Sequence, residues 1–133
     1  MKKLLPVFIA VLLLAGCAAP AVQEISYRQI TMDEAVAMME KEEDYIILDV
    51  RTVAEYNEKH IPGAINIPNE TIGADAIPEL PDKDQLILVY CRSGNRSKQA
   101  SEKLVKLGYT NVVEFGGIID WPGETETNEG GPL

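Results

Sequence analysis

Short apolar segments alternate with helical segments along this chain of 133 residues, and the alternation limits the fold more than any other feature. Residues 45–50, 64–67, 85–90 and 112–115 are rich in β-branched and large apolar side chains, which is typical of buried strands. A further short strand is expected at 27–30. Strands that are apolar on both faces belong to parallel sheets covered by helices on both sides. The sequence therefore predicts one α/β domain, with a mainly parallel sheet and flanking helices.

The helices are predicted from their caps and their apolar periodicity. Thr31 and Glu34 form a capping box at the start of a helix over about 32–43. A short helix is expected over 52–59, and a longer one over 97–107, where the glycine that follows is a stop signal. Two less regular segments are also expected: at most a short helix around 72–80, and a turn with a short helix over 116–121.

The first 16 residues are predicted to be a signal peptide. Lys2 and Lys3 precede an apolar run of 12 residues, which is shorter than the roughly 20 residues of a membrane-spanning helix. The run ends in Leu14-Ala15-Gly16-Cys17, which resembles the lipobox of bacterial lipoproteins. This resemblance implies cleavage before Cys17 and lipid on its sulfur, which would anchor the domain at the bacterial cell envelope on the extracytoplasmic side. The alternative is an ordinary secreted protein in which Cys17 is removed or forms a disulfide.

These features divide the chain into four parts: a signal peptide (1–16), a lipidated cysteine and tether (17–26), a folded domain (27–123) and an acidic, Gly-rich tail (124–133). Loss of the signal peptide removes two lysines and changes the formal charge from −9 to −11. Such an acidic chain argues against nucleic acid as a partner. If Cys17 is lipidated, Cys91 has no disulfide partner in a compartment where disulfides form, and it is expected to be a reactive thiol.

The run Cys91-Arg92-Ser93-Gly94-Asn95-Arg96-Ser97 lies between a predicted strand and a predicted helix. Unpaired amides and the helix dipole point into such a loop, and two guanidinium groups add positive charge. A thiol placed there ionises more easily than a free one, and the thiolate is the nucleophilic form. The alternative interpretation of Cys91 is a small buried hydrophobe, which the polar residues around it disfavour.

Five short motifs occur in an order that resembles a single-domain rhodanese. They are Leu48-Asp49-Val50-Arg51, Glu55-Tyr56, the run from His60 to Pro68, the run from Tyr90 to Ser97, and Gly116-Gly117 with Trp121. The resemblance covers about 27–121 and implies a central, mainly parallel five-stranded sheet with helices on both faces. It also implies a sulfurtransferase that carries sulfur as a persulfide on Cys91.

The resemblance implies that a small anionic sulfur donor such as thiosulfate loads Cys91, and that cyanide or a thiol, a protein thiol included, accepts the sulfur. Backbone amides of the loop are expected to hold the donor and the persulfide. Arg92 is expected to steer the donor, whereas Arg96 either binds the donor or only braces the loop. The predicted substrate-binding residues are Arg92, Ser93, Gly94, Asn95, Arg96 and Ser97.

Two other functions remain open at this stage. Phosphatases and arsenate reductases of related fold carry five residues between cysteine and arginine, whereas four separate Cys91 from Arg96, which favours sulfur over oxyanion chemistry. The chain could also be a non-enzymatic persulfide carrier or partner-binding module. No cofactor or metal site is predicted, because one histidine and one remaining cysteine are too few ligands.

The other polar residues of the motifs are given structural roles. His60 is expected to form structural hydrogen bonds, because an ionised thiol needs no general base. Asp49 and Arg51 are also expected to be structural, with Arg51 and Glu55 at i,i+4 spacing as one pairing. Lys98 is expected to be a solvated helix residue.

Overall fold

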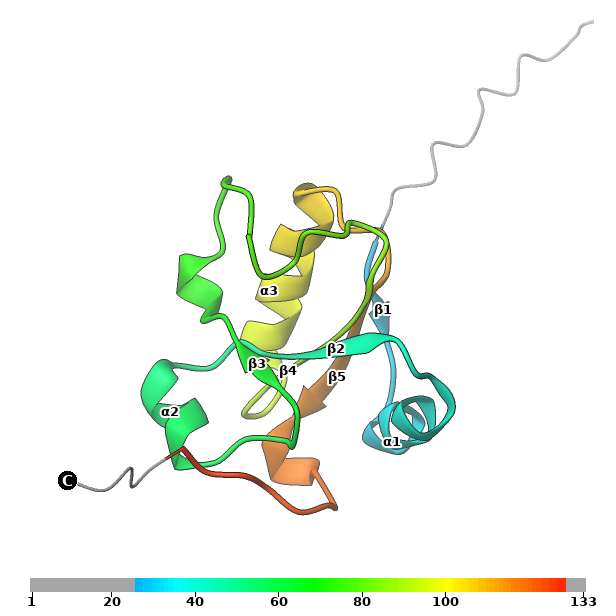
Figure 1. Ribbon diagram of the computed structural model, residues 1–133, viewed down its shortest axis with the longest axis vertical. Coiled ribbons are helices and arrows are strands. Elements are labelled where there is room, and N and C mark those ends of the chain that lie inside the picture. The colour runs from blue at the N-terminus through cyan, green and yellow to red at the C-terminus, as the bar shows by residue number, and fades with distance from the viewer. Residues whose placement is uncertain (1–25, 129–133) are drawn as a thin grey trace, which may run out of the picture.

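The computed structural model describes residues 26–128, which form a five-stranded parallel sheet with helices on both faces (Figure 1). The spatial order is β1-β5-β4-β2-β3, and every neighbouring pair is parallel. The predicted α/β fold with a mainly parallel five-stranded sheet is therefore confirmed. The strands are β1 (Arg28–Gln29), β2 (Tyr45–Asp49), β3 (Ile65–Asn66), β4 (Leu86–Cys91) and β5 (Val112–Gly117).

Within residues 26–128, three α-helices and one turn of 3₁₀ helix connect the strands, and a second 3₁₀ turn follows the last strand. Capping boxes begin the first two helices, one from Thr31 and Glu34 and one from Thr52 and Glu55, and each satisfies amides that would otherwise lack partners. No helix within residues 26–128 is long and apolar enough to cross a membrane. The helices are α1 (Met32–Lys41), α2 (Val53–Glu58) and α3 (Asn95–Lys106), with 3₁₀ turns η1 (Asn69–Thr71) and η2 (Ile118–Asp120).

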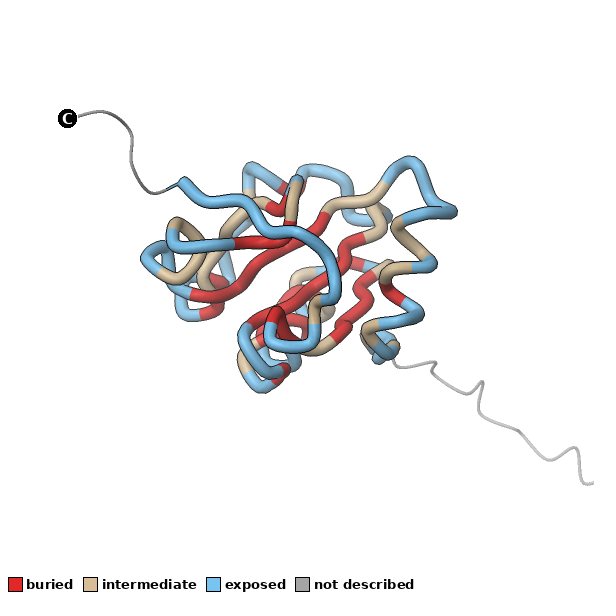
Figure 2. The backbone as a smooth tube through the Cα atoms, turned by 90° about the horizontal axis from the view of Figure 1, so that it is seen from below, coloured by how far each residue is buried: buried red, intermediate tan, exposed pale blue. Residues whose placement is uncertain are grey.

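The sheet is the centre of the core, as the buried segments in Figure 2 show. On one face α3 packs through Ala100 and Leu104, together with Ile72 and Leu80 from the long connection before β4. The other face is covered by α1, α2 and η2. Alternate residues of a strand point to opposite faces, so β4 and β5 contribute to both layers.

One predicted helix begins earlier than expected, and the segment expected to contain at most a short helix contains none. The segment 72–80 contains no helix, because Gly73 and Pro78 interrupt it, and its only neighbouring helical turn is η1. The segment is held instead by buried side chains and by a hydrogen bond of 2.6 Å from the Tyr109 hydroxyl to the carbonyl oxygen of Leu80. The helix predicted from residue 97 begins two residues earlier, at Asn95.

The segment 124–128, which the sequence assigns to the tail, runs beside α2. Glu126 and His60 exchange two backbone hydrogen bonds, of 2.8 and 2.9 Å, and the amide of Asn128 donates to the carbonyl oxygen of Asn57. The predicted signal peptide and Cys17 lie outside the described residues.

Candidate active site

Cys91 is the last residue of β4, and the loop that follows leads directly into α3. Ligands of parallel α/β sheets bind beyond the carboxyl ends of the strands, which is where this loop lies. Gly94 is the N-cap of α3 with a φ of 112°, a left-handed conformation that favours glycine. Asn95 begins the helix, and no described residue other than glycine has a positive φ.

The sulfur of Cys91 is buried and still makes polar contacts. The residue is only 1% exposed and belongs to the core cluster on the α3 face, so the expectation that polar flanking residues would keep it out of the core is wrong. Its Sγ nevertheless accepts a hydrogen bond from the Gly94 amide at 3.0 Å and lies 3.4 Å from the hydroxyl oxygen of Ser97. The backbone of the loop thus brings donors to a sulfur enclosed by the core.

Burial and hydrogen bonding act on this thiol in opposite directions. Burial raises the pKa of Cys91, whereas hydrogen bonds from the Ser97 hydroxyl and from the amides of Ser97, Gly94 and Ser93 lower it. The hydrogen bonds prevail, and the pKa of Cys91 lies below its ordinary value. Cys91 therefore loses its proton to form the thiolate more readily than a free cysteine does.

The loop rests on the end of β5. Gly117 is paired with Cys91, and a Cβ atom added at Gly117 would overlap the carbonyl group of Arg92 and the amide nitrogen of Ser93. Only a glycine allows the two backbones to approach this closely. The amide of Ile119 also donates to the carbonyl oxygen of Arg92, at 3.3 Å.

Arg96 reaches out of the loop to α2. Its Nη1 and Nη2 atoms donate to the two carboxylate oxygens of Glu55 at 2.7 and 3.0 Å. The hydrogen bonds from Arg96 hold the pKa of Glu55 at about 2. This pairing supports the bracing role for Arg96, and it shows that Glu55 is not the partner of Arg51.

Arg51 instead pairs with Asp49 inside the domain. The distance from Arg51 Nη2 to Asp49 Oδ2 is 2.7 Å, and the same carboxylate oxygen accepts from the Tyr90 hydroxyl at 2.7 Å. Arg51 Nη2 also donates to the carbonyl oxygen of Lys59. Tyr90 completes this network by accepting from the amide of Ile61, a role that no sequence pattern indicated.

His60 is also bound by structural contacts, as expected. Its Nδ1 donates to the carbonyl oxygen of Tyr56 at 2.8 Å, and its ring stacks on the Tyr56 ring with centroids 3.9 Å apart. Its Nε2 lies 3.6 Å from a carboxylate oxygen of Glu126.

A cavity of about 290 Å³ opens beside the loop. It is bordered by the exposed Arg92, by charged residues between β2 and the end of α2, and by Ile118 and Ile119 of η2. Lys98 is exposed on α3 and does not line this cavity. The cavity lining residues are Arg51, Glu55, Glu58, Lys59, Arg92, Ile118 and Ile119.

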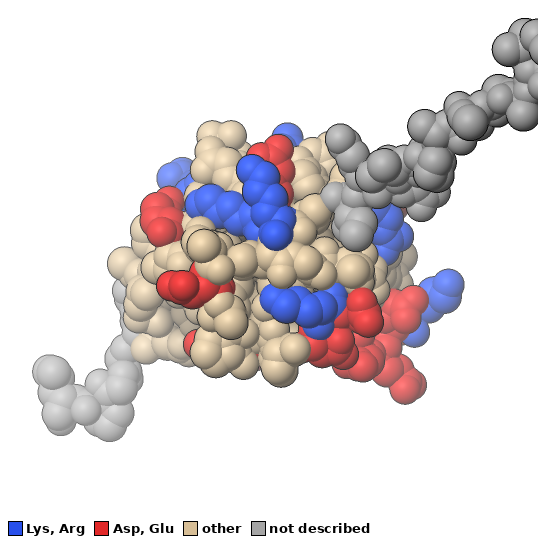
Figure 3. Space-filling model, turned by 90° about the horizontal axis from the view of Figure 1, so that it is seen from above, with Lys and Arg blue, Asp and Glu red and all other residues tan. Residues whose placement is uncertain are grey.

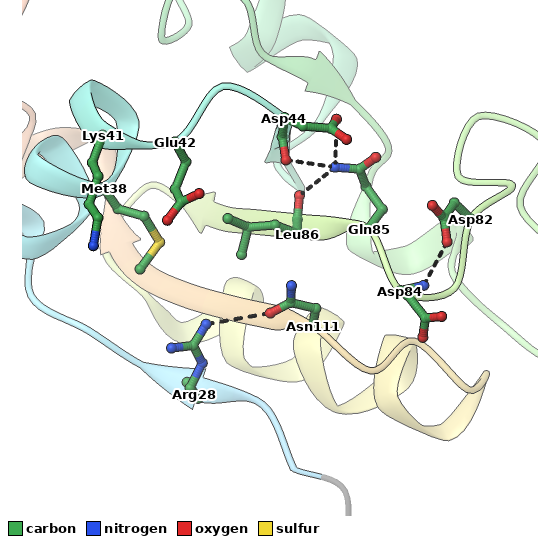
Figure 4. A pocket seen from close by; sticks show the side chains of 10 residues that line it. All are labelled: Arg28, Met38, Lys41, Glu42, Asp44, Asp82, Asp84, Gln85, Leu86 and Asn111. Atoms are coloured by element: carbon green, nitrogen blue, oxygen red, sulfur yellow. Dashed lines mark hydrogen bonds between the residues drawn. The ribbon is translucent and has the colours of Figure 1, made fainter.

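A larger pocket, of about 490 Å³, lies at the opposite end of the sheet. Figure 4 shows its lining, which includes Asp44 before β2, Leu86 at the start of β4 and Asn111 before β5. Five residue steps along β4 separate Leu86 from Cys91, or about 16 Å. Of these two cavities, the one beside Arg92 is therefore the nearer to Cys91.

Glu114 is a residue of this site that the sequence analysis missed. It lies on β5, is only 3% exposed, and its Oε1 accepts from the Ser97 hydroxyl at 2.7 Å and from the Gly116 amide at 2.9 Å. The sequence did contain one sign of such a role, because Glu114 is a charged residue inside a predicted strand that is otherwise apolar. Its proximity to the loop depends on the pairing of β4 with β5, which the sequence alone does not give.

Charge is distributed unevenly over the surface. On the face shown in Figure 3, the largest acidic group gathers at the lower right beside basic side chains, and other acidic side chains lie close to basic ones elsewhere on the face. That face has no broad basic area of the kind that binds a phosphate backbone.

Comparison with known proteins agrees with the fold and with the position of the cysteine loop. The model of the rhodanese-like domain family matches residues 31–123. The thiosulfate sulfurtransferase PspE of Escherichia coli K12 is 41% identical over 73 residues, which are 55% of this chain and 70% of that protein. The putative sulfur carrier protein YrkF of Bacillus subtilis is 34% identical over 102 residues, 76% of this chain but 54% of that protein.

A solved structure described as an E. coli rhodanese with anions superposes with a TM-score of 0.57 and 36% identity, covering 62% of this chain and 98% of that one. The five-stranded parallel sheet, the cysteine loop at the head of α3 and these similarities agree. The chain belongs to the rhodanese-like domain family, whose relatives include sulfurtransferases.

Proposed function

We propose that this protein is an enzyme that moves sulfane sulfur from thiosulfate or a similar anionic donor to a thiophilic acceptor, through a persulfide on Cys91. The observation that carries the proposal is the environment of one sulfur atom. Cys91 Sγ accepts from the Gly94 amide at 3.0 Å at the head of α3, and its pKa lies below that of an ordinary thiol. The nucleophilic thiolate therefore forms more readily than in a free cysteine.

In the first half of the reaction, the Cys91 thiolate attacks the outer sulfur of thiosulfate. A sulfur–sulfur bond forms to Sγ, the sulfur–sulfur bond of the donor breaks, and sulfite leaves with the bonding electrons. The product is an anionic persulfide on Cys91. The amides of Ser93, Gly94 and Ser97 lie close to the place where its charge develops, and they need little reorganisation during the reaction.

In the second half, cyanide or a thiolate attacks the terminal sulfur of the persulfide. The bond from that sulfur to Sγ breaks, and its electron pair returns to Cys91 as thiolate. A protein thiol is a further candidate acceptor, because the cavity at Arg92 is open to the surface and Ile119 at its rim is 62% exposed.

Arg92 is the side chain best placed to bring in an anion. It is exposed and borders the cavity, whereas Arg96 is neutralised by Glu55 and Arg51 by Asp49. The similarity to a rhodanese whose structure is described as containing anions supports an anionic donor. Long-range repulsion by the acidic chain is screened beyond about 8 Å at physiological salt.

The direct test is mass spectrometry of the purified protein after treatment with thiosulfate. The Cys91 peptide is expected to gain one sulfur atom, about 32 Da, and to lose it again when cyanide is added, with release of thiocyanate. Cys91→Ser is the matched control, because it keeps the size and polarity of the side chain but removes the thiol. A wild-type peptide that gains no sulfur, or thiocyanate formed equally fast by Cys91→Ser, would contradict the proposal.

A second candidate is a persulfide carrier without turnover of its own, which is favoured by the similarity to a putative sulfur carrier protein. Repeated turnover distinguishes the two. An enzyme releases many equivalents of thiocyanate per Cys91, whereas a carrier releases one equivalent and then requires a partner for reloading. Oxyanion chemistry is disfavoured, because Arg96 is held by Glu55 and is not free to bind a phosphate centre.

We also propose that this domain is held at the bacterial cell envelope by lipid on Cys17 and faces away from the cytoplasm. This proposal is supported by the short apolar run and the Leu14-Ala15-Gly16-Cys17 motif alone. Stable anchoring requires two or more acyl chains such as palmitate, since one chain gives only marginal binding.

A further inference from the structure

A buried carboxylate lies two hydrogen bonds from the sulfur of Cys91. Glu114 Oε1 is 2.7 Å from the hydroxyl oxygen of Ser97, and that oxygen is 3.4 Å from Cys91 Sγ. All three residues are at most 3% exposed. They come from three elements, β5, α3 and β4, and they meet on the face of the sheet that α3 covers.

The Ser97 hydroxyl has one proton and several acceptors around it. Gly94 offers its carbonyl oxygen at 2.9 Å, Glu114 its carboxylate, and Cys91 its sulfur. If Glu114 is ionised, it accepts the hydroxyl proton, and Ser97 is then an acceptor for a protonated Cys91. If Glu114 is protonated, it donates to Ser97, and Ser97 is then a donor for the thiolate. The direction of both hydrogen bonds thus depends on where one proton resides.

The charges nearby disfavour two anions at once. The separation of Sγ from Oε1 is at most about 6 Å, the sum of the two hydrogen-bond lengths, and like charges so close in a buried site repel strongly. Within residues 26–128 no lysine or arginine pairs with Glu114, whose contacts are Ser97 and the Gly116 amide.

The other charged groups around the site do not compensate for a second anion. Arg96 on α3 interacts electrostatically with Cys91 but is paired with Glu55 of α2. Arg92 in the loop and Lys98 on α3 are exposed. On the β1 side of β5, the residue in register with Glu114 is Gln29, which is uncharged.

We propose that Cys91 and Glu114 share one proton through the Ser97 hydroxyl. In the transfer, the S–H bond of Cys91 breaks, its proton passes to Ser97 Oγ, and the Ser97 proton passes to Glu114 Oε1. A thiol and a carboxylate become a thiolate and a carboxylic acid, without gain or loss of protons. Glu114 is a positioning residue in this scheme, because it acts on the sulfur only through Ser97.

The consequence for sulfur transfer rests on the proposed function. Cys91 gives up its proton to Glu114 before it attacks the donor, and it recovers the proton after the persulfide has passed on its sulfur. The proton therefore stays inside the domain during the cycle, and the buried site never holds two negative charges.

The test is the pH dependence of Cys91 alkylation by iodoacetamide in the full chain, followed by mass spectrometry on the Cys91 peptide so that Cys17 does not contribute. Glu114→Gln has the size of the native side chain and cannot ionise. It is expected to lower the alkylation midpoint of Cys91 by about one pH unit or more, because no carboxylate competes for the negative charge. Ser97→Ala is expected to raise the midpoint, because it removes the donor to the thiolate.

The double variant tests the route of the proton. In the Ser97→Ala background, Glu114→Gln is expected to shift the midpoint much less than in the wild type. If Glu114→Gln shifts the alkylation midpoint equally in both backgrounds, the carboxylate acts on Cys91 only through space. If it shifts the midpoint in neither, Glu114 does not influence Cys91. Either result overturns the proposal.

Infrared difference spectra supply a readout that keeps Glu114 in place, in case its variants fold poorly. The carbonyl band of a protonated carboxylic acid is expected in the wild type at the pH where Cys91 reacts with iodoacetamide, and it should disappear in Cys91→Ser and after alkylation of Cys91. A band unchanged in all three, or absent from the wild type, contradicts a shared proton. Neither measurement uses a sulfur donor, so failure of sulfur transfer and failure of proton sharing are distinguishable.

Discussion

The guanidinium of Arg96 and the carboxylate of Glu55 make two hydrogen bonds, of 2.7 and 3.0 Å, across 41 residues of sequence. The pair ties the first turn of α3 to the first turn of α2, and so fixes the loop that holds Cys91. It also neutralises the positive charge of Arg96, so that Arg92 is the cation that borders the cavity from the loop.

Glu55→Gln is expected to lower the free energy of unfolding at pH 7 by about 1 kcal/mol, the range of partly exposed ion pairs. Arg96 lowers the pKa of Glu55 from 4.5 to about 2 in the folded state, so the stabilisation is present above pH 4.5 and is lost as the pH falls toward 2. Urea unfolding at pH 7 and at pH 3 measures this difference. Glutamine keeps the capping box with Thr52, so the variant tests the ion pair itself.

The control for this experiment is Glu58→Gln, because Glu58 is exposed on the same helix and forms no ion pair with a described residue. Its unfolding should follow the wild type at both pH values. If Glu55→Gln and the wild type lose the same stability between pH 7 and pH 3, the pair does not contribute as described.

Asp49→Asn is expected to destabilise the domain by about 3–5 kcal/mol. Asp49 is fully buried, and its removal leaves the buried Arg51 without an anion and the Tyr90 hydroxyl with a weaker acceptor. Chemical denaturation of the two proteins measures the loss.

The double variant Asp49→Asn with Arg51→Met separates charge from packing. It is expected to recover part of the lost stability, because it no longer buries an unpaired cation. If the double variant is instead less stable than Asp49→Asn, the unpaired charge of Arg51 does not cause the loss of stability.

Local features of this fold were predictable from the sequence, because their signals lie within a few residues. The capping box of Thr31 and Glu34 and the buried strands are such features, and all are present. The cysteine at the junction of β4 and α3 could likewise be identified. Each depends on chain chemistry over a span of one turn or one strand.

Contacts between distant segments could not be predicted in this way. The Tyr90 hydroxyl donates to the Asp49 carboxylate across 41 residues, because β2 and β4 pair in register at these two residues. Glu114 reaches Ser97 only because β5 pairs with β4 beside α3. Long-range register decides these contacts, and one sequence does not specify that register.

Gly117→Ala is expected to reduce sulfur transfer at least tenfold, because its Cβ would overlap the backbone of Arg92 and Ser93 and displace the loop from Cys91. Overpacking of this kind also destabilises a domain by about 1–3 kcal/mol. Thiosulfate loading of Cys91 and thermal unfolding measure the two effects.

Gly73→Ala is the matched control for Gly117→Ala. Gly73 has ordinary backbone geometry and no atom within 4 Å of an added Cβ, so the same methyl group should leave activity and stability nearly unchanged. Equal behaviour of the two variants would show that the close approach of β5 does not shape the loop.

Cys17→Ser is expected to move the protein from the membrane fraction to the soluble fraction in a bacterial host, because serine cannot take the thioether-linked lipid. Fractionation followed by immunoblotting measures the distribution, and metabolic labelling with palmitate should be lost at the same time. Cys91→Ser is the control and should remain in the membrane fraction. A Cys17→Ser protein that stays with the membrane would contradict lipid anchoring.

Arg92→Gln is expected to raise the KM for thiosulfate about tenfold with a smaller change in kcat, because the exposed guanidinium binds the incoming dianion and does not touch the sulfur. Steady-state kinetics at low and high salt measure this, and the difference from the wild type should shrink as salt screens the charge. Lys98→Gln removes an equal charge from an exposed position six residues along the chain and should change KM less than twofold. If both variants raise KM equally, the donor responds to the net charge of the domain. An effect confined to Arg92 means that this one side chain at the cavity selects the anion.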